Sequence, residues 1–245
     1  MAEGFDLTQL IYIIKDERAG ELRNSDGLRF IGHCLSHASL STSQNYQDVF
    51  AAVTNKFQPG FFVEFGATNG VDGSNTLLLE KLYGWTGLLA EPNPDCHEAL
   101  IKNRKCDSTT WCVHTKSDEW LPFLIADEPD LSTMQGYGLD DEHAAKRANG
   151  RVVDVRTITL FDLLDFFGAP HHVEYLSVDT EGGEYDILKK FFEENNNKYT
   201  FGAVTVEHNY NVEKRDSIYS LMVANGYKRV LTEFSRWDDF FVRNV

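Results

Sequence analysis

Positive charge is scarce in this sequence of 245 residues. Its 23 lysine and arginine residues stand against 38 aspartate and glutamate residues, which gives a formal net charge of −15. Affinity for nucleic acid comes mainly from cationic side chains that contact phosphate. The balance therefore argues against DNA, RNA and acidic membranes as partners.

Long apolar runs are also missing. No stretch approaches the roughly 18 consecutive apolar residues that a membrane-spanning helix needs, so we expect no transmembrane segment. Residues 1–6 carry no basic region, and the apolar patch 10–14 ends at Lys15 rather than at a small-residue cleavage site. No secretion signal is therefore predicted.

The cysteines contain no C-x-x-C pair. Cys34, Cys96, Cys106 and Cys112 lie in a chain long enough to bury its own core, so they need not act as disulfide staples. We interpret them as reduced thiols, which predicts a cytoplasmic protein.

Short apolar runs alternate with helical patterns from Phe61 onward, which predicts a parallel β-sheet flanked by helices. The strands expected from these runs are 61–65, 87–90, 110–113, 173–178, 201–206, 227–231 and 239–242. The last two should form an antiparallel pair at the end of the chain. The predicted fold class is α/β, with a mostly parallel, seven-stranded sheet.

The segment in front of this alternation looks mostly helical. It spans residues 1–57 and has apolar patches at 5–14 and 46–57. We expect a helical N-terminal cap there, followed by a main domain over residues 58–245.

A second segment interrupts the alternation. Residues 127–150 are polar and contain glycines, and they separate two further expected strands at 121–126 and 151–158. The segment is too long for a plain connection. We interpret it as a lid or a disordered insert.

The loop after the first expected strand is rich in glycine. Gly66, Gly70 and Gly73 follow Glu64 with the spacing G-x-x-x-G-x-x-G, whereas a dinucleotide site would require G-x-G-x-x-G. Glu64 would also place negative charge near a phosphate. An acidic residue beside a glycine loop instead suits a ligand with an ammonium group, such as the amino-acid end of S-adenosylmethionine.

Glu91 stands at the end of the second expected strand. An acidic residue there can accept both ribose hydroxyls of a bound nucleoside. Glu64 and Glu91 could alternatively be solvated loop carboxylates. Together with the terminal antiparallel pair, the two loops favour a class I, Rossmann-like methyltransferase fold over a dehydrogenase.

A series of short motifs runs through the chain, at Ser43–Gln44, Gln47–Asp48, Phe61–Ala67, Ser74–Thr76, Leu79–Lys81, Trp85–Gly87, Glu91–Pro94, Thr159–Leu160, Asp162–Leu164 and Ser177–Glu184. In this order they resemble motifs of the FkbM family of S-adenosylmethionine-dependent methyltransferases. The resemblance covers most of residues 43–243. Residues 1–42 lie outside it, and nothing in 127–150 matches the family.

The resemblance implies a methyltransferase that acts on a hydroxyl, since family members are best known for O-methylation of sugars and natural products. The expected acceptor is a sugar, a glycan or another small metabolite. The resemblance also implies which residues hold the cofactor. The ribose would be held by Glu91, and the methionine end by Glu64, Gly66, Asn69, Gly70 and Asn75.

Acidic side chains gather after the fourth and fifth expected strands. Asp179, Glu181 and Glu184 follow the fourth strand, and Glu207 with His208 follows the fifth. In a doubly wound sheet these strand ends lie near each other, so the carboxylates would repel one another. A raised pKa or a divalent cation would relieve that repulsion. Oxygen ligands with one imidazole suit Mg²⁺ or Mn²⁺.

The arrangement is similar to catechol O-methyltransferase, in which an aspartate after strand four and two consecutive residues after strand five bind Mg²⁺. The candidate metal ligands are therefore Asp179, Glu207 and His208. Two alternatives stay open. One is an acidic cluster without a metal, and the other is a structural role in which Asp179 caps the helix that starts near Glu181.

Methyl transfer to a hydroxyl also requires a group that removes the proton. The candidate catalytic residues are Asp179, Glu181 and His208, and His143 in the insert is a further candidate base. None of them can be preferred on the sequence alone.

Two other functions stay open at this point. The domain could be a catalytically silent interaction module, and nicotinamide-dependent oxidoreductases use the same kind of sheet. Against the first stand four intact residues, Glu64, Asn75, Glu91 and Asp179. Against the second stand the glycine spacing and Glu64. The chain could also form a homo-oligomer.

Overall fold

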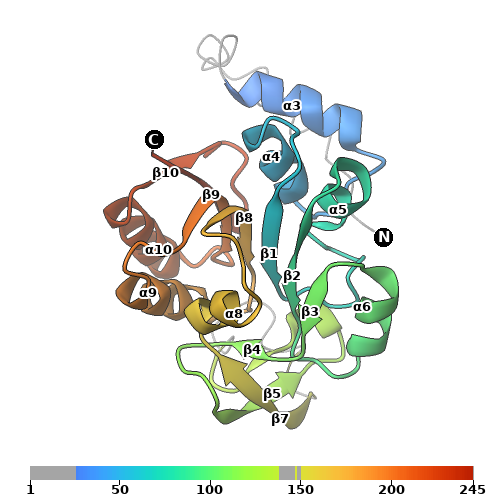
Figure 1. Cartoon of the computed structure of the whole chain (residues 1–245), viewed down its shortest axis with the longest axis vertical. Coiled ribbons are helices and arrows are strands. Elements are labelled where there is room, and N and C mark those ends of the chain that lie inside the picture. Colours follow the sequence, from blue (N-terminus) through green and yellow to red (C-terminus); the bar gives the residue numbers. More distant parts are fainter. Residues whose placement is uncertain (1–25, 138–146, 148–149, 245) are drawn as a thin grey trace.

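The computed structural model describes residues 26–137, 147 and 150–244. Its centre is a seven-stranded sheet in the order β10-β11-β9-β8-β1-β2-β3 (Figure 1). In chain order these strands are β1 (Phe61–Phe65), β2 (Thr86–Ala90), β3 (Asp107–Thr109), β8 (His172–Val178), β9 (Thr200–Glu207), β10 (Tyr227–Val230) and β11 (Asp238–Arg243). Five of them pair in parallel, whereas β11 runs antiparallel to both β9 and β10. The predicted sheet and its antiparallel end are confirmed.

The third strand differs from the prediction of 110–113. β3 ends at Thr109, where the backbone turns, and the following apolar residues form β4 (Cys112–Val113) in a different sheet. β3 is an edge strand, and its Asp107 is exposed. An edge strand can be polar, so β3 has no apolar run that the sequence analysis could recognise. The apolar run assigned to it belongs to β4.

A second, four-stranded sheet has the order β4-β7-β5-β6 and lies below the central sheet in Figure 1. Its other strands are β5 (Trp120–Ile125), β6 (Thr133–Met134) and β7 (Arg151–Ile158). The predicted strands 121–126 and 151–158 correspond to β5 and β7, which pair antiparallel. Cys112, Phe123 and Met134 belong to the small core of this sheet.

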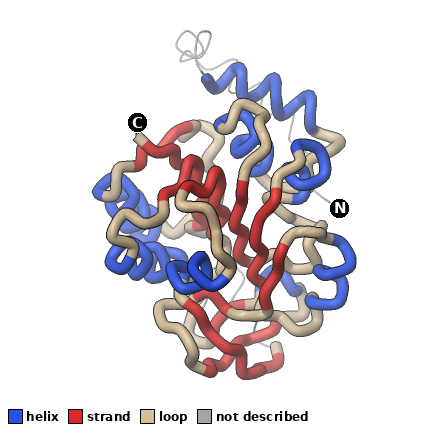
Figure 2. The backbone as a smooth tube through the Cα atoms, viewed as in Figure 1, coloured by secondary structure: helices blue, strands red, loops and turns tan. Residues whose placement is uncertain are grey.

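Helices cover both faces of the central sheet (Figure 2). One face is covered by α3 (Asp26–His37), α4 (Gln47–Thr54), α5 (Leu77–Tyr83) and α6 (His97–Asn103). The other is covered by α8 (Leu160–Phe166), α9 (Glu184–Glu194) and α10 (Val212–Ala224). Successive strand residues point to opposite faces, so Phe62 joins the first core and Val63 the second. Both faces are buried, which explains why the central strands are mainly apolar rather than alternating between apolar and polar residues.

The N-terminal helices pack directly on the sheet. Phe30 of α3 and Phe50 of α4 share one core with Phe62 of β1 and Phe240 of β11. The predicted apolar patch 5–14 lies outside the described residues. None of the described helices combines the length and apolarity that crossing a membrane requires.

Candidate active site

A cavity that is partly open to solvent lies at the carboxyl ends of β1, β2 and β8. The lining comes from the loops after these strands, from the second sheet and from the turn before α4. The lining residues that carry the argument below are Gln44, Gly66, Asn75, Glu91, Asp179 and Glu181. In parallel sheets this edge is the usual place for a ligand.

Gly66 allows the loop after β1 to approach the end of β8 closely. Its φ angle is +71°, and a Cβ atom built there would lie 2.3 Å from the backbone oxygen of Asp179. Only glycine fits both the left-handed conformation and this close approach. The loop after β1 and the loop after β8 are thereby joined beside the cavity.

Glu64 does not line the cavity. Its carboxylate is buried beneath the loop, where it accepts hydrogen bonds from Asn75 N at 2.6 Å and from Ser74 Oγ at 3.1 Å. Arg104 Nη1 lies 3.7 Å from the same carboxylate. The structure therefore gives Glu64 the role of holding the loop in place.

Asn69 and Gly70 also lie behind the cavity wall. Asn69 Oδ1 accepts from the backbone N–H groups of Val71 and Asp72, each at 3.0 Å, which forms a tight turn. Gly70 packs on the side chain of Arg104. Of the five residues predicted to hold the methionine end, only Gly66 and Asn75 face the cavity.

Arg104 is a structural residue that the sequence analysis missed. Its guanidinium is buried and donates to Ser74 Oγ at 3.0 Å and to Thr76 Oγ1 at 2.9 Å. It also pairs with Glu80 at 2.8 Å. The arginine lies at the end of α6 and reaches a loop about 30 residues earlier, so no local pattern could have indicated it.

Glu91 faces the cavity, as expected. Its two carboxylate oxygens accept from Thr68 N and Asn93 N, each at 2.7 Å. Burial raises the pKa of Glu91 to about 7, and the charge of Asp179 acts in the same direction. Each oxygen keeps a further lone pair, so ribose hydroxyls can still be accepted.

Replacing Glu91 with alanine is expected to weaken S-adenosylmethionine binding by roughly 1.5 to 3 kcal/mol, the usual scale for hydrogen bonds to a charged group. Isothermal titration of Glu91→Ala against wild type measures this loss. Glu98→Gln, which changes an exposed glutamate of α6, is the control and should bind normally. Unchanged affinity in Glu91→Ala would remove the ribose assignment.

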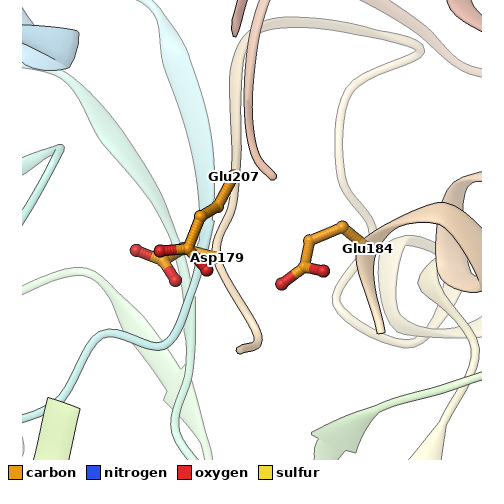
Figure 3. Close-up of side chains that lie close together, drawn as sticks. All are labelled: Asp179, Glu184 and Glu207. Atoms are coloured by element: carbon orange, nitrogen blue, oxygen red, sulfur yellow. The ribbon is translucent and has the colours of Figure 1, made fainter. Parts of the chain in front are cut away.

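Three carboxylates converge beside the cavity. Asp179, Glu184 and Glu207 each place an oxygen within 4.8 Å of the others. Figure 3 shows Asp179 and Glu207 side by side, with Glu184 pointing toward them from the start of α9. We call this group the acidic cluster.

His208 lies outside the acidic cluster. Its Nε2 is 3.9 Å from Asp239 Oδ1, and its Nδ1 accepts from Tyr210 N at 3.2 Å. Glu207 ends β9 and His208 follows it, so the two side chains point in opposite directions. The structure therefore places Glu184, rather than His208, with Asp179 and Glu207.

Lys214 neutralises one member of the acidic cluster. Its Nζ lies 2.6 Å from Glu184 Oε2. Burial opposes the charge of Glu184, but Lys214 and backbone hydrogen bonds hold its pKa below the ordinary value. Glu184 also accepts from the N–H groups of Thr180 and Gly182, each at 2.9 Å, and so shapes the loop after β8.

Asp179 and Glu207 have no such partner. Neither forms a salt bridge with any residue that the structure describes, and the two side chains are hydrogen-bonded to each other. Burial raises the pKa of Asp179 to about 7 and also raises the pKa of Glu207 well above its usual value. Glu207 Oε2 is buried, and no described residue forms a hydrogen bond with it. The pair therefore retains a proton near neutral pH or requires a cation.

Glu181 lines the cavity with a strained backbone, at a φ angle of +58°. Its Oε2 accepts from Arg147 Nη2 at 2.7 Å and from Asn209 Nδ2 at 3.1 Å. Burial and the charge of Asp179 raise its pKa to about 8, although Arg147 acts in the opposite direction. Arg147 comes from the insert, and the sequence analysis did not predict this pair.

The other candidate bases are less well placed. His208 does not line the cavity, and burial lowers its pKa to about 4, so the imidazole is neutral at pH 7. His143 lies outside the described residues.

The insert forms part of the cavity wall. Pro129, Ser132, Met134 and Tyr137 line it, and Tyr137 Oη donates to Asp186 Oδ2 at 3.1 Å. The rest of the predicted lid, at 138–146 and 148–149, lies outside the described residues. Closure over an acceptor stays a prediction.

The buried carboxyl groups predict lower stability above neutral pH. Burial raises the pKa of Asp48, Glu91 and Asp179 to about 7, and that of Glu181 to about 8. In the unfolded chain such groups have a pKa of about 4, so between pH 6.5 and 8 only the folded state loses protons. The free energy of unfolding should fall by roughly 1 kcal/mol per group across this window. In the folded state, His208 is already neutral throughout this window.

Urea unfolding at pH 6.5 and pH 8 measures this fall. Asp48→Asn is the informative variant, because Asp48 is fully buried away from the cavity. It should show a smaller fall than wild type. A free energy of unfolding that rises between the two pH values would contradict the prediction.

Comparison with known proteins gives the family. The family model described as the methyltransferase FkbM domain matches residues 64–243. The chain belongs to this family. The class I methyltransferase fold of FkbM proteins agrees with the sheet order found here, in which a parallel sheet ends in an antiparallel strand pair. The comparison with curated proteins gives no match.

Solved structures with a similar fold include an FkbM methyltransferase from Methylobacillus flagellatus. It is 13% identical, with a TM-score of 0.40 over 76% of this chain and 43% of that chain. An O-methyltransferase from Bacillus cereus, in complex with SAH, is 11% identical, with a TM-score of 0.42 over 96% of each chain. A putative RNA methyltransferase from Pyrococcus horikoshii is 12% identical, with a TM-score of 0.42 over 80% of each chain.

Proposed function

We propose that this FkbM domain transfers a methyl group from S-adenosylmethionine to a hydroxyl of a sugar, a glycan or another small metabolite. The observation that carries the proposal is that one cavity joins Glu91, after β2, to Asp179, after β8. The ribose of the cofactor would lie at Glu91. Its sulfonium methyl would then point toward Asp179, where the acceptor binds.

The chemistry required of the protein is modest, because the cofactor supplies the reactive carbon. The acceptor oxygen attacks the methyl group, the sulfonium becomes a neutral thioether, and the hydroxyl proton must leave. Asp179 in its ionised form would accept that proton. Its pKa of about 7 suits a general base near neutral pH, and hydrogen bonding to Glu207 holds its carboxylate in place.

A divalent cation fits the same position. The acidic cluster offers only oxygen ligands, which Mg²⁺ and Mn²⁺ prefer, and Glu207 Oε2 is a buried oxygen that no described residue contacts by a hydrogen bond. Asp179, Glu184 and Glu207 would hold the ion, in competition with Lys214 for Glu184. When bound, such an ion would lower the pKa of a hydroxyl that contacts it.

Two measurements test this function. Isothermal titration with S-adenosylmethionine, with NADH for comparison, tests the cofactor. A radiolabelled methyl-transfer screen over glycans, nucleotide sugars and small polyols, with EDTA, Mg²⁺ or Mn²⁺, tests the acceptor and the ion. Preferential binding of NADH would contradict the proposal. Cofactor binding without transfer to any acceptor would instead favour the catalytically silent interaction module.

A further inference from the structure

The turn before α4 is attached to the loop after β1. Thr42 Oγ1 donates to the backbone oxygen of Ser74 at 3.0 Å, and Ser43 forms a parallel β-bridge with Gly73. Ser43 Oγ also lies in hydrogen-bond contact with Asn75 Oδ1, at 2.9 Å. The turn and the glycine loop therefore form one unit of the cavity wall.

The turn is also held from its other side. Gln47 accepts from Asn45 N at 2.8 Å and donates from Nε2 to Asp238 Oδ2 at 2.8 Å. Gln47 is buried, and Asp238 begins β11 of the central sheet. Gln44, which lies between these anchored residues, therefore starts from a fixed backbone position.

Gln44 presents its side chain to the cavity next to Gly73. It lines the cavity, and its Nε2 would lie 3.9 Å from a Cβ atom built at Gly73. Within the described part of the chain, the Gln44 side-chain amide has no hydrogen-bond partner. An exposed amide on an anchored turn is thus free to bind a ligand.

The charges of the cavity indicate what Gln44 binds. The lining carries the carboxylates of Asp72, Glu91, Asp179 and Glu181, and none of its described residues is lysine or arginine. The amino-acid end of S-adenosylmethionine has an ammonium group, which suits this lining, and a carboxylate, which does not. The carboxylate therefore requires neutral N–H donors.

Gln44 and Asn75 carry the amide side chains of the described cavity lining. Asn75 Nδ2 already donates to Ser177 Oγ at 3.0 Å. His114 follows β4 and lies on the wall formed by the second sheet. With the ribose at Glu91, the methionine end would extend along the glycine loop toward Gln44.

We propose that Gln44 is a cofactor-binding residue whose side-chain amide donates to the α-carboxylate of S-adenosylmethionine. The inference rests on the proposed function, because it requires that cofactor in this cavity. The inference assigns a binding role to Gln44, which precedes β1 in the sequence.

Two ligands isolate this contact. S-adenosylhomocysteine contains the full amino-acid group, whereas 5′-methylthioadenosine has the same nucleoside and thioether without it. Isothermal titration of Gln44→Ala should show about tenfold weaker binding of S-adenosylhomocysteine and unchanged binding of 5′-methylthioadenosine. Gln44→Glu should weaken S-adenosylhomocysteine further, because it adds a like charge beside the carboxylate.

Gln58→Ala changes another exposed glutamine, outside the cavity, and is the matched control. Equal weakening of both ligands by Gln44→Ala, or no weakening of either, would overturn the inference while leaving the proposed function in place. Failure of the wild-type protein to bind either ligand would overturn both.

Discussion

Replacing Asp179 with asparagine is expected to slow methyl transfer about 10²- to 10⁴-fold, the range that general acid–base catalysis supplies. The substitution keeps the size of the side chain but removes the charge that accepts a proton or binds a cation. Cofactor affinity should change little, because the ribose contact lies at Glu91. Turnover of an accepted acceptor, together with titration of the cofactor, measures the two effects separately.

Asp216→Asn, which alters an exposed carboxylate of α10, is the control for Asp179→Asn and should keep full activity. Chelation with EDTA distinguishes the two possible roles of Asp179, as a general base and as a metal ligand. If an ion is required, EDTA should stop turnover and Mg²⁺ or Mn²⁺ should restore it. Full activity in EDTA would show that no metal ion is required, and the pair of Asp179 and Glu207 would then act as the base alone. Full activity of Asp179→Asn would refute both roles.

Gly66→Ala is expected to destabilise the folded protein by about 3 to 5 kcal/mol, which is a severe effect for one methyl group. The new Cβ would meet the backbone oxygen of Asp179 at 2.3 Å, so the loops after β1 and β8 would have to separate. Cofactor binding should weaken with them. Urea unfolding measures the stability, and isothermal titration measures the binding.

Gly84→Ala supplies a matched control. Gly84 has a φ angle of +66°, close to that of Gly66, but no atom lies within 4 Å of a Cβ built there. Its substitution should cost only the strain of the left-handed conformation, about 1 to 2 kcal/mol. Equal losses in the two variants would show that the contact with Asp179 is unimportant.

The fold could be predicted largely because the central strands are buried on both faces. β1, β8 and β9 therefore appear as mainly apolar runs between helical patterns. The second sheet could not be predicted as a unit. Two of its strands, β4 and β6, have two residues each, which is too short for any periodicity.

The candidate site, too, could be predicted only in part. The position of Asp179 and Glu207 at neighbouring strand ends follows from the order of the strands, so their proximity could be predicted. The orientation of single side chains could not. Glu64 turns beneath its loop, and His208 turns away from Glu207. Arg147, which pairs with Glu181, comes from a distant segment, so only the tertiary structure reveals it.

The acidic lining of the cavity has a consequence for the end of the catalytic cycle. S-adenosylmethionine carries a positive sulfonium, and the spent cofactor, S-adenosylhomocysteine, is a neutral thioether. The wall carries four acidic side chains, of which Glu181 is paired with Arg147, and their remaining negative charge attracts the first more strongly than the second. Transfer of the methyl group thus removes the charge that held the ligand, and the cavity itself favours release of the product.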